Sequence, residues 1–459
     1  MPKPPTPRKS VAQTTDAAPV QPALKRVIGV GGVAFTSFNT IVGAGIFGLP
    51  ALVAAVLGPA AILAYLLCAG LIALVGLCFA EAGSRVSDSG GLYAYARAAF
   101  GPVVAGIAGM LLLVANSIAA SAALARFLVE TLAGFWPAAD GAAVRTAILA
   151  AVYLVLAAVN MRGARQGARL ATVMAVVKLA PLITLAVVGS FSIAPANLQW
   201  TQWPSMSSFG QGAVLLFFAF MGVEAGLGTS GETRDPARTI PRAIVLALTL
   251  VATLYIALQL VAQGVLGAAL PTETAPLVAT ATAVFGPWGT RLLLATTLLS
   301  ATGYLVADVL SSPRIAYALA EAGQLPRRFA AVHPRFGTPA VAIGSYAALC
   351  FVMAATGSFR QLVLLASSGT LALYLIGCLG VLRLRSRGVA MAGEPFRASG
   401  GAAVPLLAAA IIVWMLLTLE WSELASAGGL IVAAALVYGI QERLRRGRHN
   451  QPRSANETT

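Results

Sequence analysis

The chain has 459 residues, of which 58% are hydrophobic and only 10% are charged, and its mean hydropathy is +0.83. Soluble domains carry about 25% charged residues, so this composition excludes a soluble globular protein and indicates an integral membrane protein. The net charge of +15 comes from basic residues in short connections between apolar runs. That distribution is a sign of membrane topology and not of a surface for nucleic acid.

The N-terminal segment, residues 1–24, is polar and contains several prolines, which predicts a disordered tail. It has no hydrophobic centre, so no cleaved signal peptide is expected. Residues 442–459 are predicted to form a second tail. All four cysteines lie inside apolar runs, and their spacing predicts neither a metal site nor a disulfide framework.

Twelve apolar runs follow one another between the two tails. Each is long enough to cross a hydrocarbon core of ~30 Å if some tilt is allowed. They lie at 28–56, 59–83, 101–133, 145–161, 170–193, 209–230, 242–267, 288–320, 338–356, 361–382, 403–419 and 424–441. We therefore predict an all-α integral membrane protein with twelve transmembrane helices.

The basic residues predict the orientation of these spans. Twelve spans place both termini on one side, and a cytoplasmic N-terminus puts all but five of the 31 Lys and Arg residues in cytoplasmic segments. The five exceptions are Arg126, Arg145, Arg291 and Arg360 outside, and Lys178 within a span. Because cytoplasmic loops are enriched in Lys and Arg, both termini are predicted to be cytoplasmic.

The first apolar run is interrupted at its middle by Gly43, Gly45, Gly48 and Pro50. Glycine costs about 1 kcal/mol in a helix interior and proline about 3. Non-helical backbone survives at membrane depth only beside protein or a wet cavity. The free N–H groups at such a break suit a carboxylate. We therefore expect a substrate site around Gly43, Ala44 and Gly45.

The sixth run repeats a residue spacing found in the first. Phe38 lies five residues before Gly43, and Phe217 lies five residues before Gly222. Paired interruptions in two halves of a chain indicate inverted repeats with a binding site at the membrane midplane. Five spans is an odd number, so the second unit enters from the opposite side. The predicted repeats are 25–193 and 205–385, followed by two additional helices in 403–441.

Several motifs resemble those of the amino acid–polyamine–organocation transporters. Gly43–Phe47 resembles the glycine signature of their first helix, and Phe218–Glu224 resembles that of their sixth. Ser89–Arg97, Gly231–Pro241 and Ala320–Pro339 resemble their cytoplasmic segments, which shape the inner gate or only set topology. The resemblance covers nearly the whole chain. It implies a LeuT-like fold with broken helices 1 and 6, alternating access and an amino acid substrate.

The resemblance also implies which residues contact substrate. The substrate ammonium would meet the carbonyls of Ile41, Phe218 and Met221, which match the family's site. Phe218 matches an aromatic residue that closes over substrate, although it could be an ordinary core or lipid-facing side chain. Asn116 in the third span is expected to face the pocket or to hydrogen-bond between helices. Tyr374 in the tenth span is a weaker gate candidate.

Three ionisable residues lie at membrane depth, where charges are costly and usually functional. The resemblance implies that Glu224 couples binding to gating, and the alternative is a carboxylate that caps a half-helix. It implies that Lys178 exchanges a proton beside the first helix, and the alternative is a fixed positive charge there. Asp308 could recognise a cationic substrate side chain, pair with Lys178 or satisfy neighbouring backbone.

Two absences argue against an enzyme. The only histidines, His333 and His449, fall in a cytoplasmic loop and a tail, and the chain has no Gly-Lys-Ser/Thr phosphate loop. No cofactor or metal is expected, and a channel fits paired broken helices less well than a carrier. The sequence thus predicts a secondary transporter of L-amino acids in the cell membrane, favouring proton symport of neutral substrates. Exchange of cationic amino acids or polyamines is the alternative.

Overall fold

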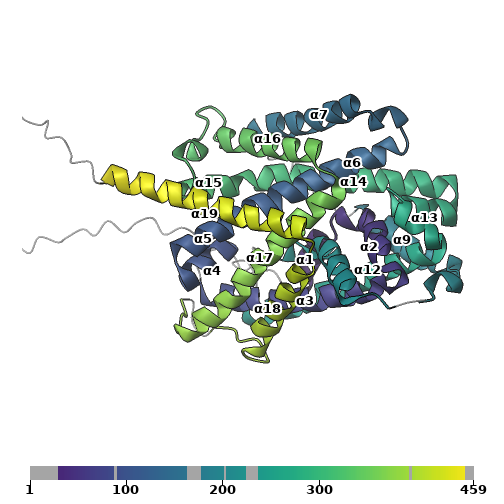
Figure 1. Cartoon of the computed structure of the whole chain (residues 1–459), viewed down its shortest axis with the longest axis horizontal. Coiled ribbons are helices and arrows are strands. Elements are labelled where there is room, and N and C mark those ends of the chain that lie inside the picture. Colours follow the sequence, from purple (N-terminus) through teal and green to yellow (C-terminus); the bar gives the residue numbers. More distant parts are fainter. Residues whose placement is uncertain are drawn as a thin grey trace, which may run out of the picture.

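The computed structural model describes residues 29–86, 90–162, 177–200, 203–223, 236–391 and 395–449. Every regular element in these ranges is a helix (Figure 1). Seven helical stretches are long and apolar enough to cross a membrane, and five shorter apolar helices accompany them. The protein is therefore an all-helical, multi-pass membrane protein, as its composition predicts.

The first half of the chain contains eight described α-helices. They are α1 (Val30–Ile41), α2 (Leu49–Leu57), α3 (Ala61–Arg85), α4 (Gly91–Phe100), α5 (Pro102–Leu111), α6 (Ala120–Ala133), α7 (Ala142–Met161) and α9 (Leu179–Gly189). Two short elements matter for the site: the 3-10 helix η1 (Gly45–Phe47) and the π-helical segment η3 (Leu112–Ala119).

The second half contains nine described α-helices. They are α10 (Met206–Phe217), α12 (Pro236–Leu266), α13 (Pro276–Phe285), α14 (Pro287–Ser311), α15 (Pro313–Glu321), α16 (Ala340–Thr356), α17 (Phe359–Ser386), α18 (Ala403–Leu417) and α19 (Trp421–His449). The 3-10 helix η7 (Phe218–Phe220) directly follows α10.

The first run is broken where its glycines predict an interruption, since a break and η1 separate α1 from α2 within 28–56. The observed helices differ from the expected runs elsewhere. The run 288–320 is divided at Ser312, where Pro313 ends α14 and begins α15. Helix α13 (Pro276–Phe285) was not predicted. The twelve-span topology with inverted repeats stays a prediction.

Helix α17 lies at the centre of the bundle. It contacts α3, α4, α6, α10, α18, α19 and η3. A capping box formed by Ser358 and Gln361 begins it. Glycines allow close approach to its neighbours: a Cβ at Gly377 would lie 2.5 Å from Phe79 Cε1, and one at Gly369 would lie 2.3 Å from Ala115 Cβ. Around this axis, α6 lies beside α14, and α7 lies beside α16 (Figure 1).

One end of α3 is tied to the end of α17 by a buried ion cluster. The Glu81 carboxylate, which is fully buried, accepts hydrogen bonds from Arg385 at 2.6 and 2.7 Å and from Arg85 at 2.9 and 3.1 Å. The backbone N–H of Ala398 donates a further bond to it at 3.1 Å. A buried carboxylate is costly unless it is paired and hydrogen-bonded, and this one has both kinds of partner.

Candidate functional site

The break after α1 is a tight backbone turn. Helix α1 ends where the Val42 N–H donates to Phe38 O at 2.9 Å. Val42 has φ −70° and ψ 73°, and the Gly43 N–H donates to Ile41 O at 2.6 Å. These values define an inverse γ-turn centred on Val42. The chain then passes through η1 into α2, so the first span is two helical pieces joined by a non-helical turn.

This turn divides the three N–H groups that the sequence assigns to a carboxylate. The Gly43 N–H is already used by Ile41 O. No backbone–backbone hydrogen bond among the described residues uses the N–H of Ala44 or of Gly45. The prediction that Gly43 donates to a ligand therefore conflicts with its geometry, whereas Ala44 and Gly45 retain donors that suit an anion.

The break after α10 is built differently. After η7, Met221 is extended, with ψ 154°, and Gly222 has φ +105°. L-residues rarely adopt that conformation, so Gly222 is required by its backbone. A Cβ at Gly222 would lie 3.4 Å from Thr40 Cγ2, so the second break also packs against the end of α1.

Tyr255 on α12 joins the two breaks. Its hydroxyl donates to Ile41 O at 3.0 Å and to Ala219 O at 3.2 Å. The ring is fully buried and packs edge-on against Phe220, with centroids 5.3 Å apart. Sequence reasoning missed this residue. A tyrosine in the middle of an apolar run is the available signal, because its buried hydroxyl needs a partner.

A cavity lies where the two breaks meet. Its volume, counted as the space open to the centre of a water molecule, is about 100 Å³. One water needs roughly 10–15 Å³ by that measure, so the cavity holds several waters or one small solute. The residues that line it come from α1, η1, η3, α6, η7 and α14 and from the two breaks. They are Thr40, Ile41, Gly43, Ala44, Gly45, Asn116, Ala120, Leu124, Phe218, Ala219, Met221, Gly222 and Tyr304.

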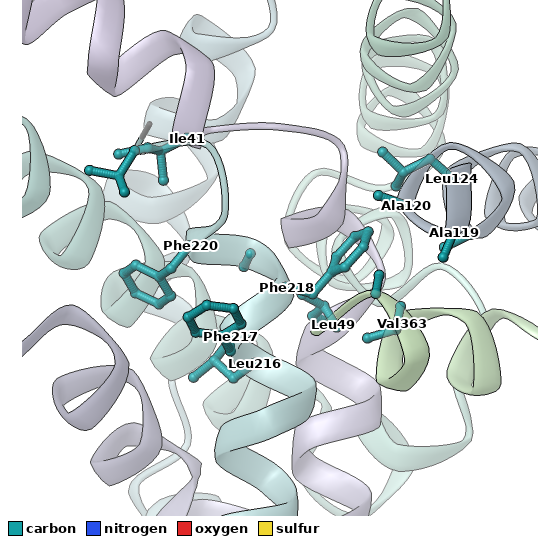
Figure 2. Close-up of a cluster of buried hydrophobic side chains, with 14 of the residues drawn as sticks. Ile41, Leu49, Ala119, Ala120, Leu124, Leu216, Phe217, Phe218, Phe220 and Val363 are labelled. Carbon is teal, nitrogen blue, oxygen red and sulfur yellow. The ribbon is translucent and has the colours of Figure 1, made fainter. Parts of the chain in front are cut away.

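The structure brings seven of the predicted site residues to this one cavity. They are Ile41, Gly43, Ala44, Gly45, Asn116, Phe218 and Met221. Phe218 points toward Ala120 and Leu124, whereas Phe217 and Phe220 point the other way (Figure 2). None of the lining residues has a charged side chain, so the described wall is apolar apart from backbone groups and a few neutral polar side chains.

Asn116 lies in a segment whose geometry the sequence does not signal. Leu112–Ala119 is π-helical, and the Ser117 hydroxyl donates to Leu112 O, five residues earlier. Single π-helical turns inside α-helices occur often at functional sites. Asn116, which lines the cavity, lies within this wider π-helical turn, next to α6.

Asp308 does not line the cavity. Its carboxylate, 7% exposed, accepts hydrogen bonds from the Ser312 hydroxyl at 2.7 Å and from the Tyr346 hydroxyl at 2.7 Å. The side chain of α14 that reaches the cavity is Tyr304, one helical turn earlier. Asp308 therefore lies one helical turn beyond the position of α14 that lines the cavity.

Two of the other three predicted residues lie away from the cavity, and the third is not described. Lys178 precedes α9 and is 6% exposed, and no ion pair among the described residues joins it to Asp308. Tyr374 is buried against Phe79 and Phe217 and does not line the cavity. Glu224 lies outside the described residues.

Comparison with known proteins adds independent findings. A family profile described as "Amino acid permease" matches residues 28–388. The methylthioribose transporter of Bacillus subtilis is 27% identical, over 95% of this chain and 97% of its own length. The branched-chain amino acid permease of the same organism is 24% identical, over 90% and 92%. Its serine/threonine exchanger is 30% identical, over 72% and 76%.

Proposed function

The chain belongs to the amino acid permease family, and from that premise we propose that it carries a small neutral L-amino acid by alternating access. Family and relatives are transporters and not enzymes. The observation that carries the substrate proposal is the cavity at the two broken helices, whose described lining has no charged side chain. Unwound backbone beside a midplane cavity is how such carriers hold a zwitterion.

The backbone of the first break binds the carboxylate in this proposal. The N–H groups of Ala44 and Gly45 lie at the start of η1, which precedes α2, and have no backbone acceptor among the described residues. Two such donors provide charge-assisted hydrogen bonds, which are roughly twice as strong as neutral ones. Gly43 contributes space instead, since a Cβ there would meet only Ile41 O, at 3.8 Å.

The backbone of the second break binds the ammonium. A carbonyl oxygen has two lone pairs, and those of Ile41 are both occupied, by the Gly43 N–H and the Tyr255 hydroxyl. The Phe218 carbonyl accepts only a long bond, 3.4 Å, from the Met221 N–H among the backbone bonds. The ammonium is therefore assigned to the carbonyls of Phe218 and Met221.

Apolar side chains select the substrate side chain. Ala120, Leu124, Phe218 and Met221 face the remaining space, and Tyr304 and Asn116 supply neutral polar groups. The names of two relatives, the branched-chain amino acid permease and the serine/threonine exchanger, point to the same class of neutral substrates. Exchange of cationic amino acids or polyamines has less support, because Asp308 is bonded to Ser312 and Tyr346.

Proton symport is the proposed energy source, with Lys178 as a proton-exchanging group. Its ammonium is nearly fully buried beside a helix that contacts α12 and α14. Desolvation disfavours the charged form of a buried lysine, which makes proton release accessible. The proposal also includes the predicted topology of twelve spans with two inverted repeats and both termini cytoplasmic.

Purified protein in proteoliposomes tests this function. Labelled alanine should accumulate when an inward proton gradient is imposed, should saturate with concentration, and should not respond to a sodium gradient. Excess serine or leucine should compete strongly, and excess lysine or putrescine weakly. Uptake driven by sodium alone, or competition by lysine equal to that by leucine, would contradict the proposal. Linear, non-saturating flux would indicate a channel.

A further inference from the structure

Asp308 stands in a buried group of hydroxyl-bearing side chains drawn from four helices. Ser312, the residue between α14 and α15, and Tyr346, on α16, donate to its two oxygens at 2.7 Å. Ser121 on α6 lies near the carboxyl group, and its hydroxyl is 3.3 Å from the Tyr153 hydroxyl on α7. This set, Asp308 with Ser121, Tyr153, Ser312 and Tyr346, is called the α14 hydroxyl cluster.

The cluster contains a carboxyl group without a basic partner among the described residues. Cys350 on α16 and Tyr304 on α14 are further titratable groups beside the cluster. Lys178 before α9 and Arg314 on α15 lie on elements that contact α14, and neither forms an ion pair with Asp308. On α6, Arg126 pairs with Glu130. A carboxylate held only by hydroxyls at this depth is costly, whereas the protonated acid is not.

Hydroxyl partners can serve both protonation states without movement of heavy atoms. Beside an ionised carboxylate, both Ser312 and Tyr346 donate. When the acid is protonated, its own O–H can donate to Ser312, whose hydroxyl rotates, while Tyr346 still donates to the other oxygen. Distances of 2.7 Å suit either direction of an O–H···O bond. The cluster is therefore organised to hold or release one proton.

The cluster lies directly behind the cavity wall. Tyr304, which lines the cavity, precedes Asp308 by four residues, so the two share one face of α14. Ser121 follows Ala120, which lines the cavity from α6. Any shift of α6 against α14 when the cavity fills or empties changes the distances inside the cluster.

From this geometry we infer that Asp308 is a proton-binding site coupled to the cavity, which takes up one proton with substrate and releases it after substrate leaves. The inference deepens the transport function proposed above and rests on it. In the step, one O–H bond forms at an Asp308 oxygen at the expense of a hydronium ion, and the reverse transfer to water completes the cycle. It adds Asp308 to Lys178 as a second proton-exchanging group and assigns it to coupling instead of to the substrate side chain. The pH dependence of substrate binding between pH 5 and pH 8 then arises at Asp308.

The variant Asp308→Asn tests the inference, because asparagine keeps the size of the side chain and mimics the protonated acid. Wild-type alanine binding, followed on purified protein, should weaken at least fivefold between pH 5 and pH 8, and Asp308→Asn should bind alike at both. Uptake driven by a proton gradient should be lost in the variant, while counterflow exchange of alanine persists. Glu130→Gln, whose carboxylate pairs with Arg126, is the matched control and should behave as wild type.

Infrared difference spectra of the same proteins between pH 5 and pH 8 provide a readout that needs no substrate. The wild type should show a protonated-carboxyl band that Asp308→Asn lacks and Glu130→Gln retains. Tyr346→Phe should move the midpoint of that band to higher pH, because the ionised carboxylate loses a donor. If Asp308→Asn retains the band and the pH dependence, the inference is wrong. If the band is lost as expected but no protein binds amino acids, the proposed substrate is wrong and the proton site stands.

Discussion

The two helix breaks that meet at the cavity look alike in the sequence and are built by different means. The first, after α1, turns through an inverse γ-turn with φ negative, and its glycines serve space: Gly43 faces the cavity and Gly45 faces the Phe218 ring. The second, after α10, turns through Gly222 at φ +105°. Glycine thus provides space in the first break and a positive φ in the second.

This difference shows what the Phe–x4–Gly spacing, which occurs at both breaks, can and cannot predict. It marks both interruptions correctly, because a glycine within an apolar run weakens the helix whatever else it does. It does not reveal which property of glycine is used. Substitutions that add a side chain in stages separate the two, since a methyl group tests handedness and a branched group tests space.

The largest loss is expected for Gly45→Val. A Cβ at Gly45 would lie 3.0 Å from Phe218 Cδ1 and 3.2 Å from Cε1, so a branched side chain displaces that ring from the cavity. Overpacking costs about 1–3 kcal/mol and here falls on the binding site itself. Alanine uptake in proteoliposomes should fall by about a hundredfold, the upper end of that range, with normal membrane insertion. Gly70→Val, where nothing lies within 4 Å, is the control, and equal uptake by both variants would refute the role of space.

Gly222→Ala should cost somewhat less. Its single methyl meets Thr40 Cγ2 at 3.4 Å, an ordinary contact, so the penalty arises from the positive φ. Such strain costs about 1–3 kcal/mol, which corresponds to roughly a five- to hundredfold loss of affinity. Equilibrium binding of labelled alanine measures it. Gly31→Ala in α1, with no neighbour within 4 Å, should bind normally, and wild-type affinity in Gly222→Ala would show that the break tolerates another conformation.

Tyr255→Phe should weaken binding by about tenfold, because it removes the hydroxyl that holds both breaks. Loss of one partner from a buried hydrogen bond costs about 1–3 kcal/mol. Tyr65→Phe removes the neighbouring hydroxyl, which donates to Gln259 and not to either break, and is the matched control. Alanine affinities measured by calorimetry compare the two. If both variants weaken binding equally, the hydrogen bonds of Tyr255 to the two breaks have no particular role in binding.

The smallest effect is expected for Gly43→Ala. Its φ is not positive and a Cβ would meet only Ile41 O at 3.8 Å, so the backbone tolerates alanine and the methyl enters the cavity. Alanine affinity should change by less than about threefold, whereas leucine, which fills more of the cavity, should lose about tenfold, as expected for one methyl group of lost space. Competition of labelled alanine by unlabelled leucine measures the ratio. An unchanged ratio would show that Gly43 does not border the substrate side chain.

Sequence reasoning predicted the helical membrane class and most of the cavity, because both depend on local signals. Apolar runs mark helices, and misplaced glycines mark Gly43, Gly45 and Gly222. It missed Tyr255 and Tyr304 and left the position of Asp308 open, because these depend on which face of a distant helix meets the breaks. A register error of one turn, 5.4 Å, is invisible in a hydrophobic pattern that is apolar all round. The roles of the site residues stay predictions.

The Glu81 cluster sets an order of events during synthesis. Arg85 is in place four residues after the carboxylate, but Arg385 is 304 residues away along the chain. At about 5–20 residues per second, the ribosome takes roughly 15–60 s to supply it. During that interval Glu81 has one charged partner instead of two, and α3 has no α17 against which to pack. A nascent chain stalled before α17 therefore carries a Glu81 carboxylate that lacks its Arg385 partner.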